Sequence, residues 1–290
     1  AEGKECERKT TFPKMGKSQM PIIHAAQEAS KAVKVSKGYI SDAKKIAQKA
    51  PDLLKEIKSG GKTITEAKRE LARRERNAHI ASLPDPPKWN GRFALDSVNV
   101  ADIANLDLPE NSIDLIFTDP PYHDEHLHLY KRLGQLAQRV LKPGGYCITY
   151  AGKMFLPQII QVLGESLEYV WVFSVFHPFS QSKVNKHRIF ENWRPIVVFK
   201  KSGKTQTCEW VQDVVRGVRD KELHNWQQDE EAPSQYISAY TRPGDIVLDP
   251  FVGSGTVPTV CKAIERHFVA FDKDKSAVKM ALERVADVEG

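Results

Sequence analysis

Residues 113–122 read IDLIFTDPPY, an apolar run that ends in an acid, two prolines and an aromatic residue. A short apolar run bounded by turn residues predicts a buried strand, here residues 113–118. Because proline lacks a backbone N–H and has a fixed φ angle, the following turn presents hydrogen-bond acceptors, among them the Asp119 carboxylate. Such a corner suits a substrate that donates hydrogen bonds, such as an exocyclic amino group, and Tyr122 offers a ring on which a base could stack. Taken alone, the motif could equally be a rigid corner between a strand and a loop.

A second motif lies at residues 244–256, GDIVLDPFVGSGT, where a predicted strand at 246–249 ends in an acid and a glycine-bearing loop leads into a helix at 257–265. Glycines allow the backbone to approach a nucleoside-type ligand closely, although a simple tight turn is the alternative. The loop has neither the full G-x-G-x-x-G spacing nor the lysine of a phosphate-binding loop, which favours a small nucleoside cofactor. The next predicted strand, 268–272, ends in Asp272, an acid well placed to bind ribose hydroxyls.

Short apolar runs alternate with amphipathic stretches through the rest of this region. Further strands are expected at 146–151, 170–176 and 196–200, and helices at 130–141 and 156–163. This alternation predicts an α/β fold, a mostly parallel sheet with helices on both faces.

The two motifs together closely resemble those of the amino-group DNA methyltransferases, which use S-adenosylmethionine. In that family the D-P-P-Y motif is catalytic and D-P-F-x-G-S-G-T belongs to the cofactor loop. The catalytic motif comes first here, and 130 positions separate Asp119 from Asp249. This order resembles the permuted, beta-type arrangement common among adenine-N6 enzymes. The resemblance covers about residues 91–285 and implies a Rossmann-like methyltransferase sheet that contains an antiparallel strand.

The resemblance also implies roles for individual residues. It assigns catalysis to Asp119, Pro120, Pro121 and Tyr122. It assigns the methionine end of the cofactor to a set around the glycine loop: Asp249, Phe251, Gly253, Ser254, Gly255 and Thr256. Asp272 would bind the ribose, Asp96 would lie near the adenine, and the stretch 224–228 would close over the methionine. The turn at 141–146 also matches the family and is expected to be structural.

The function implied is methyl transfer from S-adenosylmethionine to the exocyclic N6 of a flipped-out adenine in double-stranded DNA, as in restriction-modification systems. Cytosine-N4 methylation is the nearest alternative, because it offers an amino group to the same acceptors. Methylation of RNA fits the permuted order less well. A DNA-binding regulator that keeps the fold without turnover is the alternative outside the enzymes, and the complete motifs argue against it.

The charge of the chain is concentrated at its front. The net charge of the 290 residues is +6, yet residues 1–90 hold 20 Lys and Arg against 11 Asp and Glu, while residues 91–290 hold 23 against 26. A basic front on a mildly acidic body suggests a polyanion-binding module joined to a catalytic domain, although a solvated helical surface would have the same charge. We therefore expect a tail at 1–20, a small all-helical module at 21–80, a linker at 81–90 and a methyltransferase domain at 91–290.

Within the front, residues 24–48 have the pattern of a helix-turn-helix, and residues 46–71 are similar to the helical part of ParB-like DNA-binding proteins. Further helices are expected at 51–59 and at 65–77, the latter capped by Thr65. The residues expected to face DNA are Ser36, Lys37 and Tyr39 in the groove and Lys44 and Lys45 near phosphates. The alternative is a helical oligomerisation or scaffold module.

The catalytic part contains a second DNA-facing candidate, the polar and basic stretch 180–188, with Lys183, Lys186 and Arg188. Its alternative is an ordinary mobile surface loop.

The histidines at 123, 126 and 128 with Asp124 invite a metal site, but methyl transfer from a sulfonium needs no metal, so none is expected. Trp171, Phe173 and Phe176 are expected in the core.

Composition limits the remaining choices. No apolar stretch approaches the roughly 20 residues needed to span a bilayer, and the first residues lack the apolar core of a signal peptide. Four scattered cysteines indicate a reducing compartment. We expect a cytoplasmic protein of a prokaryote or phage with DNA as partner and no membrane contact. The sequence leaves open whether it forms a homodimer.

Overall fold

The computed structural model describes residues 37–178, 182–184, 187–205, 209–217 and 230–288. The chain divides into two compact units, Ala1–Ser82 and Leu83–Gly290, and each is described by itself. Ser36, Lys186, the first helix of the expected helix-turn-helix and the stretch 224–228 lie outside the described residues. Within the described part, no helix has the length and apolar character needed to cross a bilayer.

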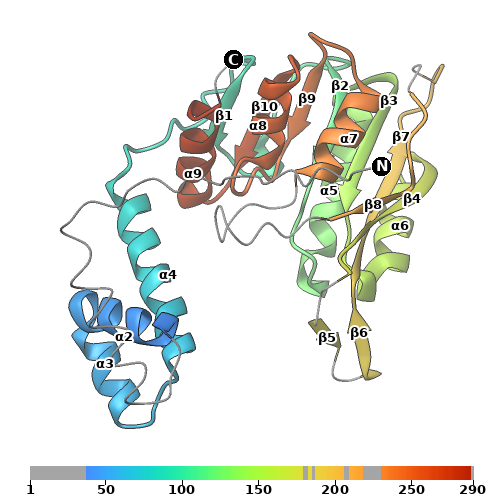
Figure 1. Ribbon diagram of the computed structural model, residues 1–290. Helices are drawn as coiled ribbons and strands as arrows, with labels where there is room; N and C mark the ends of the chain where they lie inside the picture. The colour runs from blue at the N-terminus through green and yellow to red at the C-terminus, as the bar shows by residue number, and fades with distance from the viewer. Residues whose placement is uncertain (1–36, 179–181, 185–186, 206–208, 218–229, 289–290) are drawn as a thin grey trace, which may run out of the picture. The chain divides into compact units, whose positions relative to one another are not determined.

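The first unit contains the helices α2 (Lys37–Lys49), α3 (Pro51–Lys58) and α4 (Ile64–Ser82) (Figure 1). Their apolar residues recur at three- and four-residue spacing, so each helix has one face to bury. The buried cluster comprises Ile46, Ala50, Leu53, Ile64, Ala67 and Leu71. Pro51 stands in the first turn of α3, where a missing N–H costs nothing.

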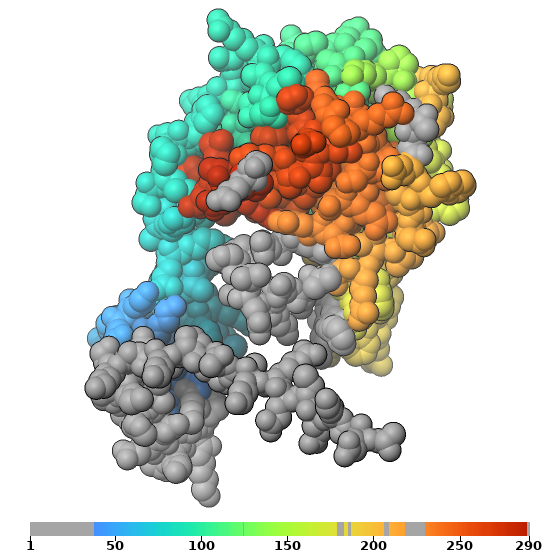
Figure 2. Space-filling view, turned by 45° about the horizontal axis from the view of Figure 1, so that its top comes forward, coloured from blue at the N-terminus to red at the C-terminus, as the bar shows by residue number. Residues whose placement is uncertain are grey.

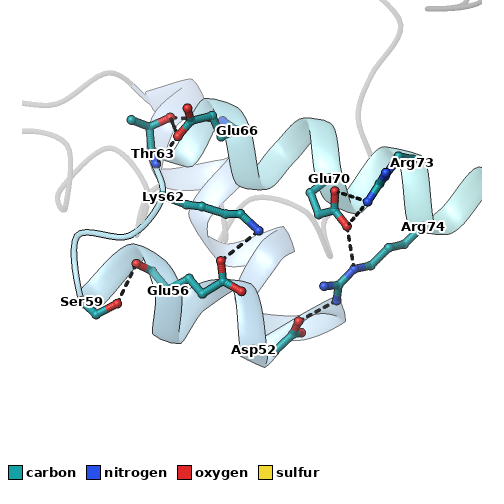
Figure 3. A network of polar contacts seen from close by, with 9 residues as sticks. All are labelled: Asp52, Glu56, Ser59, Lys62, Thr63, Glu66, Glu70, Arg73 and Arg74. Atoms are coloured by element: carbon teal, nitrogen blue, oxygen red, sulfur yellow. Dashed lines mark hydrogen bonds and ion pairs between the residues drawn. The ribbon is translucent and has the colours of Figure 1, made fainter.

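The start of α4 differs from the expected one. The cap is Thr63, not Thr65: its hydroxyl accepts the Glu66 N–H at 3.2 Å, and the Glu66 carboxylate accepts the Thr63 N–H at 2.8 Å (Figure 3). This reciprocal pair is a capping box, T-x-x-E, which satisfies two N–H groups that the first turn cannot pair. Because the helix begins at Ile64, directly after that cap, and continues to Ser82, it is also longer than the predicted 65–77.

The second unit is built on an eight-stranded sheet with the order β1-β10-β9-β2-β3-β7-β4-β8. All neighbouring strands run parallel except at β7, which is antiparallel to both β3 and β4. This confirms the mostly parallel sheet with an antiparallel strand. The strands are β1 (Ser97–Val100), β2 (Ile113–Thr118), β3 (Leu141–Tyr150), β4 (Glu168–Phe176), β7 (Trp193–Lys200), β8 (Val214–Arg216), β9 (Ile246–Asp249) and β10 (His267–Asp272).

Helices cover both faces of this sheet, as expected. The helices α7 (Glu231–Tyr240), α8 (Thr256–Ala263) and α9 (Lys275–Ala286) contribute to the buried cluster on one face, and α5 (Leu127–Val140) and α6 (Leu156–Gly164) to that on the other. Three short 3₁₀ turns are described: Ile103–Asn105, Asp124–His126 and Lys153–Phe155. Strand β1 lies beside β10 although 170 positions separate Ser97 from His267, and Figure 2 shows these ends of the sequence in one continuous body. The first and last parts of this unit therefore form a single sheet.

Part of the stretch expected as a linker belongs to this unit. Val100 donates its N–H to the Pro87 carbonyl at 2.8 Å, Trp89 donates its own to Val100 at 3.2 Å, and the Trp89 ring meets Phe271 edge to face. Residues 87–89 thus extend the sheet edge beside β1, because their backbone groups find partners there.

Two further expectations change. The stretch 141–146, expected as a turn, is the start of β3, where a register shift opposite β2 accommodates Gly144 at φ +80°. Of the three aromatic residues expected in the core of β4, only Phe173 is buried, while Trp171 is 52% exposed and Phe176 is 36% exposed. Trp171 and Phe173 lie on the same face of β4, where Phe173 stacks on the Tyr236 ring of α7 while Trp171 stays exposed, so alternation along the strand does not by itself imply burial.

Candidate active site

The two motifs meet at the middle of the sheet, where the strand order changes direction. Strand β9 is followed along the chain by its neighbour β10 on one side, and β2 by its neighbour β3 on the other, so β2 and β9 flank the switch point. In open parallel sheets, ligands bind beyond the carboxyl ends of the strands at such a point. Asp119 directly follows β2 and Asp249 ends β9, so both acids lie there.

A buried hydrogen bond joins the two motifs. The Thr118 hydroxyl donates to Asp249 Oδ1 at 2.6 Å, and the Phe251 N–H donates to the same oxygen at 3.1 Å. Asp249 is 2% exposed, and burial raises the pKa of its carboxyl to about 7 despite these two donors. Among the described residues, two neutral donors therefore hold this acid in place between the strand end and the loop that follows it.

Asp119 and Tyr122 contact each other directly. The Tyr122 hydroxyl donates to Asp119 Oδ1, and burial together with this carboxylate raises the pKa of Tyr122 well above its ordinary value. The phenol therefore stays protonated and is a hydrogen-bond donor. Pro120 is buried and Pro121 is exposed, so the two prolines fix the turn while its acid reaches the site.

Gly152, which follows β3, packs closely against Tyr122. A Cβ atom built on Gly152 would lie 2.9 Å from Tyr122 Cβ and 3.1 Å from its carbonyl oxygen. Real Cβ atoms do not approach so closely, so only glycine allows Tyr122 this position. Gly152 is not among the predicted site residues, because its role depends on a contact between the segments that follow two neighbouring strands, β2 and β3.

The glycine loop after β9 is held by the end of β10. Gly253 donates its N–H to Asp272 Oδ2 at 3.1 Å, and Asp274 donates to Oδ1 at 2.9 Å. Burial raises the pKa of Asp272 above its ordinary value. Gly255 precedes α8 at φ +85°, and a Cβ there would lie 2.7 Å from Ala281 Cα, so this position requires glycine on two grounds.

Two adjoining cavities open at this edge and share Asp119, Phe251 and Gly253. One, of about 260 Å³, lies over the ends of β1 and β10 and is also lined by Asp102, Ile103 and Asp272. The other lies over β2 and β9, and its lining adds Tyr150, Pro233, Asp249, Ser254 and Thr256. The predicted cofactor residues Asp249, Phe251, Gly253, Ser254, Thr256 and Asp272 thus gather around the catalytic motif, with Gly255 in the same loop.

Asp96 is the exception among these residues. Its carboxylate accepts the Phe268 N–H at 3.2 Å and lies 2.8 Å from His267 Nδ1, so it stands at the start of β10, at the opposite edge from Asp272. The acid that does lie at the site from this region is Asp102, which follows β1 and accepts the Ala104 N–H at 2.8 Å. The position of each acid relative to β1 distinguishes the two: Asp102 follows this short strand, at the end where ligands bind, whereas Asp96 precedes it.

Arg284 on α9 is a third residue at the site that the sequence motifs do not indicate. Its guanidinium donates to the Thr256 hydroxyl at 2.9 Å and to the Glu230 carboxylate, so it links the glycine loop to the start of α7. Among the described residues, no group of three or more His, Cys, Asp or Glu side chains could hold an ion.

The predicted DNA-facing residues lie on exposed surfaces where they are described. Tyr39 is 48% exposed on α2, and Lys44 and Lys45 are exposed on the same helix, with Lys45 3.5 Å from Glu75. Lys37 begins α2. Lys183 and Arg188 lie in the hairpin of β5 (Ser182–Val184) and β6 (Ile189–Glu191), where a loop was expected, and both are exposed.

Comparison with known proteins shows that this chain is similar to DNA methyltransferases. A family model for N6/N4 methyltransferases, described as DNA methylase, matches residues 113–283. The type II methyltransferase M.HpaI of Haemophilus parainfluenzae is 29% identical over 218 residues, which is 61% of this chain and 69% of that protein. M.BglII of Bacillus subtilis is 25% identical over 267 residues, 71% of each chain.

Solved structures share the fold at lower identity. The M1.HpyAVI–SAM complex superposes with a TM-score of 0.53 at 22% identity, over 65% of this chain and 98% of that one. The PvuII DNA methyltransferase, which is cytosine-N4-specific, gives a TM-score of 0.55 at 19% identity, over 69% of this chain and 88% of that one.

Proposed function

This chain belongs to the N6/N4 DNA methylase family, and on that premise we propose that it methylates the exocyclic N6 of adenine in duplex DNA, with S-adenosylmethionine as the methyl donor. The proposal rests on one observation above all. Asp119 lines both cavities at the switch point, so a group that it binds lies next to whatever occupies the glycine loop. This is the proximity that a transfer between two bound molecules requires.

The residues of the larger cavity fit the cofactor. Asp272 places a carboxylate, an acceptor for ribose hydroxyls, at the end of β10, and Asp102 adds a second acid at the end of β1. Ile103 and Phe251 supply apolar walls suited to a flat base, and Gly253 and Gly255 hold the loop backbone close to the site. When bound there, S-adenosylmethionine supplies an electrophilic methyl carbon on its sulfonium.

The task of the protein is then to make a weak nucleophile react. The lone pair of an exocyclic amino nitrogen is delocalised into the ring, so it attacks poorly. If the Asp119 carboxylate and the Pro120 carbonyl accept its two N–H bonds from outside the base plane, the lone pair is directed away from the ring. Such acceptors, fixed before the base arrives, lower the barrier without reorganising during the reaction.

Tyr122 has two roles when the base binds. Its hydroxyl occupies Asp119 Oδ1 in this structure, so the amino group of an incoming base replaces that hydrogen bond. The ring then provides a face on which the flipped base stacks. Because both contacts come from the corner after β2, base binding and amino-group orientation are coupled.

The helical unit is proposed to hold DNA, as its sequence suggests. Residues 37–82 carry 12 Lys and Arg against 6 Asp and Glu, and Tyr39, Lys44 and Lys45 are each exposed on α2. A net positive surface of this kind binds the phosphate backbone through release of counterions.

Product analysis tests the proposed reaction. The full chain is incubated with S-adenosylmethionine carrying a labelled methyl group and unmethylated duplex DNA, and the DNA is digested to nucleosides for mass spectrometry. We expect labelled N6-methyldeoxyadenosine. Labelled N4-methyldeoxycytidine would show that the target is cytosine and not adenine, since the same acceptors can bind its amino group. The absence of any labelled nucleoside would refute the proposal.

A further inference from the structure

The β5–β6 hairpin projects from the edge of the sheet that carries the catalytic motif. Strand β7 is antiparallel to both β3 and β4, so β4 runs parallel to β3, and its end lies at the same edge as Tyr150 and Asp119. The hairpin joins the end of β4 to the start of β7 at this edge, and Figure 1 shows it extending past the other strands. Its direction therefore follows from the strand order.

The ribbon reaches well beyond the active-site corner. Ile196 lies opposite Tyr150, and from there the β4–β7 pair continues through Pro195, Arg194 and Trp193. His177 donates its N–H to the Asn192 carbonyl at 2.7 Å, and the pairing resumes from Glu191 to Ile189. At about 3.3 Å per residue, Ile189 stands roughly 20 Å past Tyr150, about the width of a DNA duplex.

The hairpin exposes apolar side chains with no core to cover them. Phe190 is 67% exposed and Ile189 is 56% exposed, adjacent on one strand. An isolated two-stranded hairpin is marginal in water, and exposed aromatic residues on one normally mark a surface that binds something.

Cations surround this apolar tip. Lys183 lies opposite Phe190, with Nζ 5.3 Å from the ring centroid, and Arg188 is exposed beside Ile189. Among the described residues from 182 to 194 the only acid is Glu191, and Lys153 neutralises it at 2.8 Å. The tip is therefore apolar and cationic, which suits a partner that offers bases and phosphates. A symmetric contact with a second copy would bring the same cations together, which is unfavourable.

We propose that the β5–β6 hairpin is a DNA-contacting arm beside the active site, in which Phe190 and Ile189 pack against unstacked bases while Lys183 and Arg188 bind phosphates. This inference rests on the proposed function and deepens it. A base that reaches Asp119 leaves the duplex at the edge from which the arm projects. Apolar wedges that enter a base step offset part of the cost of unstacking, and cations fix the register of the backbone. A cation over an exposed ring is held weakly, so Lys183 can exchange Phe190 for a phosphate.

The test compares Phe190→Ala with Trp210→Ala in the full chain. Trp210 is a fully exposed aromatic residue that precedes β8. Because β8 runs parallel to β4 and begins with Val214 opposite Ser174, the chain before β8 comes from the direction of the start of β4, away from the hairpin. Methyl transfer is measured on unmethylated genomic duplex and on the same DNA as heat-denatured single strands. Phe190→Ala should lower kcat/KM on the duplex by about tenfold and on single strands by less than about threefold, because only the duplex requires unstacking. Trp210→Ala should equal the wild type on both.

The pair Lys183→Gln and Arg188→Gln tests the phosphate contacts. The double variant should weaken duplex binding and lower the slope of log affinity against log salt by about two. If Phe190→Ala matches Trp210→Ala on the duplex, or if it converts a dimer to a monomer in sedimentation while duplex activity persists, the arm does not bind DNA. If the wild type methylates no DNA, the proposed function fails instead, and duplex affinities of the same variants then decide on the arm.

Discussion

Charged groups serve opposite purposes in the two units. In the helical unit they lie on the surface and pair with one another: Arg74 binds Asp52 at 2.7 Å and Glu70 at 3.2 Å, with its side chain 45% exposed (Figure 3). In the second unit, by contrast, the Asp249 carboxyl is buried at the end of β9, where two neutral donors hold it. Exposed pairs contribute little to stability, whereas a buried carboxylate costs stability and remains only where its position matters.

The largest expected effect is loss of methyl transfer in Asp119→Ala. Removing the acceptor leaves the amino nitrogen conjugated with its ring, so kcat should fall by about a thousandfold or more, as for other single charge-stabilising contacts in active sites. Binding of S-adenosylmethionine, measured by calorimetry, should change little. Asp287→Ala, an exposed acid after α9, is the matched control, and turnover of Asp119→Ala near its level would contradict the mechanism.

The next effect concerns stability and pH at Asp249. Its pKa is raised from 3.8 to about 7 in the folded protein, so its contribution to stability is fully present below about pH 4 and is lost as the pH rises through 7. Asp249→Asn keeps an oxygen for Thr118 and Phe251 and removes the charge. Relative to the wild type, the variant should therefore gain a few kcal/mol between pH 4 and pH 8. Urea unfolding across this range measures the gain, and parallel curves would show that Asp249 is not the titrating group.

A smaller effect is expected at Gly152. The added Cβ in Gly152→Ala would meet Tyr122 Cβ at 2.9 Å and displace that residue from Asp119, so kcat should fall by about tenfold with KM for S-adenosylmethionine unchanged. Gly164→Ala adds the same atom where nothing lies within 4 Å, and it should match the wild type. An equal loss in both variants would show a general effect on folding.

The smallest effect should come from the surface pairs of the helical unit. Asp52→Asn and Glu70→Gln each remove a partner of Arg74, but all three side chains are in solvent contact. The melting temperature should change by less than about 2 °C in either variant, because solvent replaces the lost contacts. A larger change in differential scanning calorimetry would show that these pairs organise the unit, and the contrast with Asp249 would be lost.

Much of the site was predictable, because its chemistry is concentrated in two continuous motifs. IDLIFTDPPY and GDIVLDPFVGSGT each place a strand, an acid and a turn within a few residues, so local patterns located Asp119, Asp249 and the glycine loop. Asp272 likewise ends an apolar run, and it lines the cavity at this edge. The prediction for Asp96 differs from the structure, because the short strand Ser97–Val100 lacks a pattern that marks its direction relative to the site.

The sequence by itself therefore determined the type of sheet, the residues at the ends of its central strands and the family of the chain. Only the tertiary structure decided which distant residues join them: Asp102 instead of Asp96, Gly152 beneath Tyr122, Arg284 against the glycine loop, and a hairpin at the catalytic edge. The physical reason is the distance along the chain over which each kind of interaction acts. Periodicity and turn chemistry act over a few residues and are visible along the chain, whereas strand order, close packing and burial depend on contacts between segments that lie from about thirty to more than a hundred positions apart.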